Sequence, residues 1–353
     1  MRQETNGRTV VMIASPLEEE FVHQIRDAEP DRIELIHRPD LLFAPRYATD
    51  HYAQPGWART PEGEAEWRAL LSRAEVTWDF PIAAGKGPFE LSPNLKWVQT
   101  TSAGVGQMVK RLGVVDTDLI VTTASGVHAE PLSEFVFAAL LFHAKSFRDL
   151  QTRQRAHIWE KFCGGGLDGQ TIAIFGPGRI GRQIAKNARS FGMTVWAMAR
   201  DNNPARAADL GVDRLFTRDQ IKEMLAGADA VVLCTPHTPE TEGLIGPDDV
   251  TAMKHGTVLV NIARGVVIDE AAMIAALKSG QIAFAALDVF NQEPLPETSE
   301  LWDLPNVLIN SHSASNAASE NGKITACFIR NLHAYLDGRF EDMSPVLDKA
   351  RMY

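Results

Sequence analysis

The middle of the chain alternates short apolar runs with segments of helical periodicity, and this alternation constrains the fold more than any other feature. Six apolar runs are predicted strands, at residues 171–175, 194–198, 229–234, 257–262, 282–287 and 307–310. Helical patterns lie between them, at residues 179–191, 218–226, 247–254 and 269–279. Strands that are apolar throughout and separated by helices are typical of a parallel sheet covered on both faces. We therefore predict an α/β fold with a doubly wound parallel sheet.

The first third of the chain repeats this alternation less cleanly. It contains predicted strands at residues 9–14, 33–36, 75–78, 95–99 and 119–122, and predicted helices at 18–27, 62–71 and 130–148. The segment 45–61 is rich in Pro, Gly, Ala and aromatic residues and is predicted to be a surface loop. A single hydrophobic core stops growing at roughly 250–300 residues, so a chain of 353 residues is expected to form two domains.

Charge and cysteine usage exclude several classes of protein. The chain has 45 acidic against 35 basic residues, a net charge of −10, which argues against nucleic acid as a partner. The longest apolar stretch, 135–142, is far shorter than the roughly 20 residues that span a membrane, and the apolar run 10–14 is too short for an export signal. The three cysteines form no CxxC pair, and no metal-ligand spacing occurs, so we expect no metal site and a cytoplasmic location.

A glycine motif of the form G-x-G-x-x-G directly follows one predicted strand and opens the next predicted helix. In that context the motif indicates a dinucleotide-binding turn. The first glycine permits a tight turn, the second lets the backbone approach a pyrophosphate, and the third allows close packing of helix on strand. The N–H groups at the helix start would bind the phosphate charge. The cofactor-binding residues expected here are Gly176, Pro177, Gly178, Arg179, Ile180 and Gly181.

The residues after the next strand bear on which dinucleotide is bound. An acidic residue at that strand end would bond the adenosine ribose of NAD(H), but Ala199 and Arg200 occupy the place. An arginine there suits a 2′-phosphate, so NADP(H) is favoured. Asp201, one residue further on, could still reach a ribose, which keeps NAD(H) open; Arg200 could also be an ordinary surface charge.

Three polar residues follow later strands in positions suited to chemistry. Arg264 comes after the strand 257–262, Glu293 after 282–287, and His312 after 307–310. Ligands of open α/β sheets lie beyond the carboxyl ends of the strands. Histidine is the usual proton donor and acceptor near neutral pH, and a bonded carboxylate fixes its tautomer. Any one of the three could be a surface residue, but together they predict a site that binds an anion and moves a proton.

With these residues in place, the sequence resembles the D-isomer-specific 2-hydroxyacid dehydrogenases, in particular their glyoxylate/hydroxypyruvate reductase-like members. The resemblance covers nearly the whole chain and rests on the glycine motif, the segments 261–265 and 287–294, and the strand-end His312. It implies two Rossmann-like domains with a cleft between them. The substrate domain would be discontinuous, at 1–126 and 313–353, around a dinucleotide-binding domain at 127–312. It also implies a homodimer.

The resemblance further implies roles for individual residues. His312 would exchange the proton with the substrate oxygen, Glu293 would support the imidazolium form, and Arg264 would bind the substrate carboxylate while nicotinamide C4 delivers hydride to C2 of a small 2-keto acid. The substrate loop would be Ser102, Ala103, Gly104 and Val105, and further cofactor contacts would come from Thr235, Pro236, Thr241, Ile262, Ala263 and Asp288. The chain departs from the family pattern at Ser311, where proline is frequent, and at 313–315, where glycines are.

Alternative functions remain open at this level. The same Arg264 would serve a dehydrogenase of another small anion, such as formate or phosphite. A dinucleotide-sensing module like the corepressors of this fold would bind cofactor without turnover, although it has less need of Arg264, Glu293 and His312 together. The residues that read the substrate side chain are not assigned: Tyr47, Tyr52 and Trp57 are candidates, and packing of their loop is an equally good interpretation.

Overall fold

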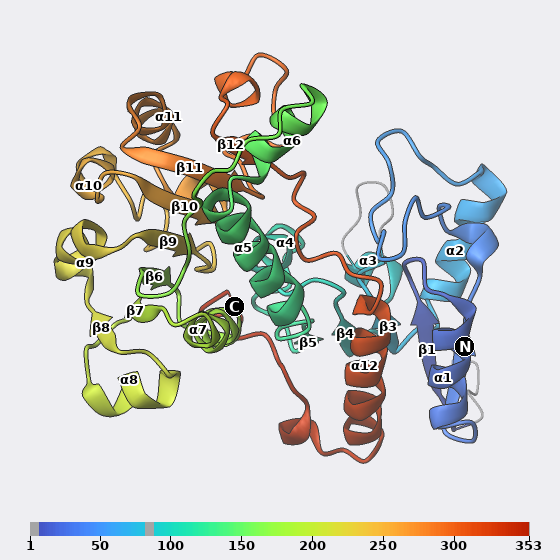
Figure 1. The fold of residues 1–353 in the computed structure, drawn as a ribbon. Coiled ribbons are helices and arrows are strands. Elements are labelled where there is room, and N and C mark those ends of the chain that lie inside the picture. The colour runs from blue at the N-terminus through green and yellow to red at the C-terminus, as the bar shows by residue number, and fades with distance from the viewer. Residues whose placement is uncertain (1–6, 82–87, 353) are drawn as a thin grey trace. The chain divides into compact units, whose positions relative to one another are not determined.

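The computed structural model describes residues 7–81 and 88–352 and divides the chain into two compact units. Unit 1 comprises Met1–His128 and Asn316–Tyr353, and unit 2 comprises Ala129–Ser315. The chain leaves unit 1, forms unit 2 and returns, so blue, cyan and red segments belong to unit 1 in Figure 1. The boundaries expected from the sequence were 126/127 and 312/313. The assignment of unit 1 to substrate and unit 2 to cofactor stays a prediction.

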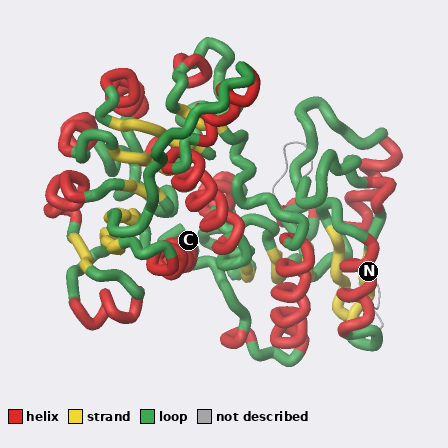
Figure 2. The backbone as a smooth tube through the Cα atoms, in the orientation of Figure 1, coloured by secondary structure: helices red, strands yellow, loops and turns green. Residues whose placement is uncertain are grey.

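Unit 1 is built on a five-stranded parallel sheet with the order β2-β1-β3-β4-β5. Its strands are β1 (Thr9–Ile13), β2 (Ile33–Ile36), β3 (Val76–Trp78), β4 (Trp97–Gln99) and β5 (Ile120–Thr122). Its helices are α1 (Glu19–Ala28), η1 (Pro39–Leu41), α2 (Pro61–Leu71), α3 (Pro88–Leu91), α4 (Gly106–Arg111), α12 (Glu320–Leu336) and η5 (Phe340–Asp342). All five strands lie within the predicted ones, and the segment 45–60 is irregular, as predicted (Figure 2).

The late helix α12 belongs to the core of unit 1 although it lies some 200 residues after the sheet's last strand in sequence. Its Phe328 stacks on Trp97 of β4, with ring centroids 4.9 Å apart, and meets Trp78 of β3 edge-on. These three side chains are fully buried. Burial of aromatic surface against the sheet explains why the end of the chain returns to the first unit.

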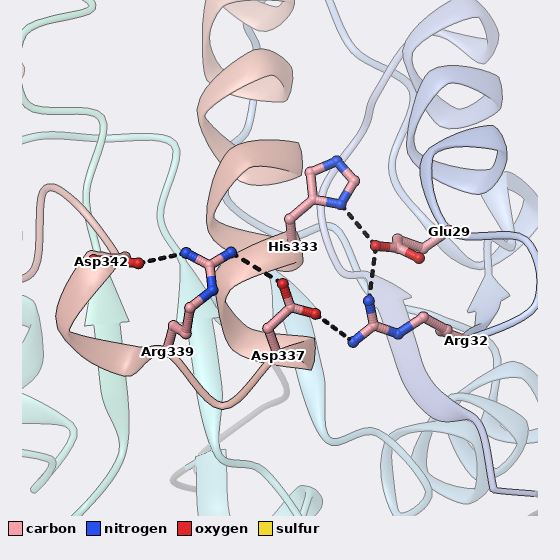
Figure 3. A network of polar contacts seen from close by, with 6 residues as sticks. All are labelled: Glu29, Arg32, His333, Asp337, Arg339 and Asp342. Carbon is pink, nitrogen blue, oxygen red and sulfur yellow. Dashed lines mark hydrogen bonds and ion pairs between the residues drawn. The ribbon is translucent and has the colours of Figure 1, made fainter.

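A chain of charged contacts joins the C-terminal ends of α1 and α12 (Figure 3). Glu29 accepts from His333 at 2.7 Å and from Arg32 at 3.1 Å. Arg32 also reaches Asp337 at 2.9 Å, and Asp337 accepts from Arg339 at 3.0 Å. Bonds from Arg339 and Arg32 hold the pKa of Asp337 below its ordinary value. This surface network ties the returning helix to the first one.

Unit 2 carries a seven-stranded parallel sheet with the order β12-β11-β10-β9-β6-β7-β8. Its strands are β6 (Thr171–Phe175), β7 (Thr194–Met198), β8 (Arg214–Phe216), β9 (Ala230–Leu233), β10 (Thr257–Asn261), β11 (Ile282–Leu287) and β12 (Val307–Ile309). Its helices are α5 (Ala129–Ala144), α6 (Phe147–Arg155), α7 (Arg179–Ser190), α8 (Pro204–Leu210), η2 (Arg218–Gln220), α9 (Ile221–Gly227), α10 (Pro247–Ala252), η3 (Gly265–Val267), α11 (Glu270–Ser279) and η4 (Glu300–Asp303). The six predicted strands are confirmed to within a residue or two, and β8 and α8 are additions.

The helix predicted over 130–148 is wrong at its end. The structure ends α5 at Ala144 and starts a separate helix, α6, at Phe147. Ser146 between them has φ +55, in the left-handed region. The carbonyl of Ala144 accepts from Gly165 N–H at 2.8 Å, so a residue twenty-one positions away satisfies the helix end.

Candidate active site

The glycine turn between β6 and α7 has the geometry that the motif predicts. Gly176 has φ +101, and a Cβ there would come within 2.9 Å of Cys234 O and Thr235 N. A Cβ on Gly181 would overlap the carbonyl of Gly176 at a separation that real Cβ atoms do not show. A Cβ on Gly178, in contrast, would meet nothing within 4 Å. The first and third glycines are thus required by the protein's own packing, and the second borders open space that a phosphate could approach.

The loop after β9 lies against this turn. The hydroxyl of Thr235 is buried and has no hydrogen-bond partner among the described residues. A polar atom left without a partner costs free energy, so its position next to the glycine turn fits a group that binds there. Thr241 bonds the carbonyl of Pro236 at 2.7 Å and accepts from Thr238 N–H, which shapes the loop. Burial raises the pKa of the Cys234 thiol to about 12, so this cysteine is inert.

Arg200 and Asp201 follow β7, where the adenosine end of a dinucleotide is expected. Arg200 is exposed. Asp201 forms an ion pair with Arg206 and accepts the Asn203 N–H at 3.2 Å. These two bonds lower the pKa of Asp201. The carboxylate that could bond a ribose is therefore already engaged within its own loop.

The structure brings Arg264, Glu293 and His312 together in unit 2. They follow β10, β11 and β12, which are adjacent parallel strands, so the three residues come from one edge of the sheet. The Nδ1 atom of His312 lies 2.7 Å from Glu293 Oε2. Arg264 is near enough to Glu293 to lower the pKa of that carboxyl. A cation, an anion and an imidazole thus form one set.

Electrostatics keep the carboxyl of this set ionised. Partial burial raises the pKa of Glu293, but the bond from His312, the Phe290 N–H at 3.0 Å and the charge of Arg264 lower it more. The net result is a pKa below the ordinary value of 4.5. At neutral pH Glu293 is therefore an anion bonded to the His312 ring.

Two buried residues that the sequence did not single out position Arg264. The side chain of Asn261 accepts from Ala263 N–H at 3.0 Å and donates to the Arg264 carbonyl at 3.1 Å. A Cβ on Gly265 would overlap the backbone of Phe290 and its successor. The glycine therefore lets the segment that carries Arg264 lie directly against the loop that carries Glu293. In the sequence, the one feature that pointed to Asn261 and Gly265 was their position on either side of Arg264 in the segment 261–265.

Asp288 organises the turn that carries His312. Its Oδ1 atom accepts from Asn310 Nδ2 at 2.7 Å, Ser313 N–H at 2.9 Å and Ala314 N–H at 3.0 Å. Its backbone carbonyl accepts the His312 N–H at 2.9 Å. His312 itself has φ +51, a left-handed conformation that needs such support. The role of Asp288 in cofactor binding stays a prediction, whereas its bonds in the structure go to this turn.

The predicted substrate loop lies in unit 1, between β4 and α4. The carbonyl of Ser102 accepts from the Thr100 hydroxyl at 2.7 Å and from Ala124 N–H at 3.2 Å. The Ser102 hydroxyl lies 2.8 Å from that of Tyr52. Ala103 is half-buried, Gly104 is exposed, and Val105 is buried at the start of α4.

The three aromatic candidates in the loop before α2 have different surroundings. Trp57 packs edge-on against Phe43, with ring centroids 5.8 Å apart, and under the guanidinium of Arg59. Tyr47 is about half exposed beside Arg46. Of the three aromatic candidates, Tyr52 is the one that the structure joins to the substrate loop.

Among the described residues, no group of three or more His, Cys, Asp or Glu side chains is arranged to hold a metal ion. No helix in the same part of the chain combines the length and hydrophobicity that a membrane crossing needs.

Comparisons with known proteins place this architecture in a family. Residues 137–314 match the family model described as D-isomer specific 2-hydroxyacid dehydrogenase, NAD binding domain. The chain is 32% identical over 290 residues to glyoxylate/hydroxypyruvate reductase B of Yersinia pestis, covering 80% of this chain and 87% of that protein. It is 33% identical over 291 residues to D-3-phosphoglycerate dehydrogenase of Mycobacterium leprae. That match covers 80% of this chain but 51% of the relative, so the chain spans about half of the relative's length.

Solved structures agree. A D-isomer specific 2-hydroxyacid dehydrogenase family protein from Aeromonas salmonicida superposes with a TM-score of 0.77 at 26% identity, covering 94% of this chain and 97% of that one. One from Xanthobacter autotrophicus, solved with NADPH and MES, gives 0.75 at 26% identity and covers 98% and 100%. The chain therefore belongs to the D-isomer specific 2-hydroxyacid dehydrogenases, oxidoreductases with two parallel-sheet α/β domains, one of which binds a nicotinamide dinucleotide.

Proposed function

We propose that this protein reduces a small 2-keto acid to a D-2-hydroxy acid with NADPH. The observation that carries the proposal is the bonded pair of His312 and Glu293 with Arg264 beside it, at the carboxyl edge of the unit 2 sheet. The name of the Yersinia relative, a glyoxylate/hydroxypyruvate reductase, supports the substrate class.

The chemistry divides between the cofactor and the side chains. A nicotinamide dinucleotide held at the glycine turn would supply a hydride for C2 of the keto acid. His312 supplies the proton to the resulting oxygen: its Nδ1 faces Glu293, so Nε2 is the atom available to the substrate. Arg264 binds the substrate carboxylate and polarises the carbonyl, and the backbone amides of residues 102–105 contribute to carboxylate binding. One hydride and one proton give the neutral hydroxyl group of the product.

The preference for NADP(H) rests on Arg200 and Asp201. Arg200 follows β7 where a 2′-phosphate is expected, and Asp201, its rival for a ribose, is held by Arg206 and Asn203. The NADPH bound to the Xanthobacter relative is consistent with this preference. Replacing Arg200 by Ala should raise the KM for NADPH by about tenfold or more and leave that for NADH nearly unchanged. Equal losses with both cofactors would contradict the 2′-phosphate argument.

Absorbance of NADPH and NADH against a panel of substrates tests the main proposal. The panel includes glyoxylate, hydroxypyruvate and bulkier 2-keto acids in reduction, and formate, phosphite and D-3-phosphoglycerate in oxidation. We expect turnover with a 2-keto acid and a loss of roughly 100-fold or more in kcat for H312A. Turnover of only formate or phosphite would favour the second dehydrogenase class. NADPH binding by calorimetry without any turnover would favour a dinucleotide sensor.

We also propose that the protein is a homodimer built from unit 2. Within residues 147–162 five large apolar side chains are exposed, among them Trp159 at 97%. Helix α6 contributes no buried residue, so its apolar side chains remain in contact with water. Exposed apolar surface of this kind marks an interaction site.

A further inference from the structure

A buried polar cluster lies at the carboxyl edge of the unit 1 sheet. Its members are Ser15, Asp79 and Thr101, which follow β1, β3 and β4, and His51 from the loop before α2. These three strands are adjacent and parallel, so their ends meet at one edge. Each of the four residues is 8% exposed or less. The proposed mechanism leaves their buried titratable groups without a role.

Asp79 is the centre of the cluster. Its Oδ1 atom accepts the Phe80 N–H at 2.8 Å, and its Oδ2 atom accepts the Thr101 hydroxyl at 3.0 Å. The Ser15 hydroxyl lies near enough to the same carboxyl to lower its pKa. Burial raises the pKa of Asp79 against the opposing effects of His51 and these donors. The residue also adopts φ +65, which directs its side chain back into the sheet edge at the cost of backbone strain.

Hydrogen bonds between the cluster and its neighbours explain how the Asp79 carboxyl can be buried here. The amide nitrogen of Asn321 donates to Glu18 at 2.9 Å, so its oxygen faces His51 Nε2, at 2.9 Å, and Nε2 carries a proton. His51 Nδ1 lies 3.0 Å from the Ser15 hydroxyl, which has a single proton to give. The His51 ring is thus held between Asn321 and Ser15, and the Asp79 carboxyl accepts from the Phe80 N–H and the Thr101 hydroxyl. Each of these buried polar groups has a partner, which offsets the cost of burying it.

The cluster reaches the substrate loop by two routes. Thr101, bonded to Asp79, is the residue directly before the loop 102–105. Tyr52, the neighbour of His51, bonds the first hydroxyl of that loop, Ser102, at 2.8 Å. The loop is thus connected to the cluster by the hydrogen bond of Thr101 to Asp79 and by the chain link between His51 and Tyr52.

We propose that Asp79 and His51 are positioning residues that set the conformation of the loop 102–105 for binding of the substrate carboxylate, acting through Thr101 and through Tyr52. The proposal rests on the function proposed above, because it deepens the role of the same loop. It predicts that loss of the Asp79–Thr101 bond weakens substrate binding and leaves hydride and proton transfer by the unit 2 residues intact.

The test compares variants at Thr101 with a control variant at a second buried threonine, Thr77. T101V removes the hydroxyl at nearly constant volume, and T101S keeps it. The control is T77V: Thr77 in β3 is fully buried, and its hydroxyl has no partner in the described part of the chain. We expect T101V to raise the KM for the 2-keto acid by about tenfold, with kcat and the Kd for NADPH changed by less than about twofold. T101S and T77V should both keep the wild-type KM to within about twofold.

Hydrogen exchange of the backbone amides at 102–105 gives a readout that does not depend on catalysis. T101V should speed exchange of this segment several-fold, whereas T77V and T101S should not. If the wild type reduces no 2-keto acid, the proposed function is refuted. If T101V still exchanges faster at 102–105 in that case, the positioning role stands. Unchanged exchange and KM in T101V, or equal changes in T101V and T77V, would overturn the positioning role.

Discussion

At the scale of single residues, the bonded pair of His312 and Glu293 gives a prediction for the proposed reduction. The pKa of Glu293 lies below 4.5, so the carboxylate is present throughout the neutral range and is lost only as the pH falls through that lowered value. Titration of Glu293 should therefore cause no loss of reduction between pH 5 and 10. The Glu293→Gln variant removes the anion bonded to the His312 ring and should lower kcat/KM by roughly tenfold across that range.

The measurement is kcat/KM for reduction from pH 5 to 10 in wild type and E293Q. Because both side chains are roughly one-third exposed or more, solvent screening limits the loss to about that size. A profile in E293Q that overlays the wild-type profile would show that Glu293 does not support His312 in the reaction.

Asp288 gives a second prediction at this scale. Its single Oδ1 atom holds three donors of the turn that carries His312, so Asp288→Ala should lower kcat by about 100-fold and destabilise the protein by about 2–3 kcal/mol. Asp288→Asn retains a carbonyl oxygen and should lose much less. Calorimetric titration with NADPH distinguishes the two roles of this residue. An unchanged Kd in D288A supports the action on the turn, and a large loss of NADPH affinity supports the contact to cofactor expected from the family.

At the scale of secondary-structure elements, the close approach of η3 to the loop after β11 determines the distance between Arg264 and Glu293. A methyl group at position 265 would overlap the backbone of Phe290, so Gly265→Ala must push one element away from the other. Displacements near 1 Å at reacting groups cost roughly 100-fold in rate, and we expect a loss of that order in kcat/KM. Gly246→Ala is the matched control, because Gly246 has φ −86 and only Asp249 Oδ2 within 4 Å. Similar losses in both variants would indicate general destabilisation.

The elements also show what the sequence could and could not predict. The long apolar strands of unit 2 and the glycine turn were predictable because each depends on neighbouring residues in the sequence. Helix α8 was missed although Asn203 caps it and Pro204 begins it, because its seven residues are too few for a clear apolar period. The end of α5 was not predictable, since the group that satisfies its carbonyl is Gly165 N–H.

In the candidate site, too, some residues could be predicted from the sequence and others could not. His312, Glu293 and Arg264 could be predicted because few residue types move a proton or bind an anion near neutral pH, and these three follow strand ends. The bonds of Asp288 to the His312 turn, and of Asp79 to Thr101, join residues more than twenty positions apart and become visible only when the strands are aligned. The residues proposed to act on the substrate were thus accessible from the sequence, whereas those proposed to position them required the tertiary structure.

At the scale of the whole molecule, the exposed apolar segment 147–162 predicts the oligomeric state. Monomers rarely leave large apolar patches in water, and a stable dimer buries about 800 Å² on each partner, to which the exposed side chains of Trp159, Ile158 and Phe162 would contribute. Sedimentation velocity should show the wild type as a dimer and Trp159→Ser as a monomer, or as a dimer that dissociates at concentrations at least about tenfold higher. Trp302→Ser is the control, because Trp302 is also exposed in unit 2 but lies outside this segment. A wild type that sediments as a monomer at micromolar concentration, or a W159S variant that dissociates like W302S, would show that the segment 147–162 does not hold two copies together.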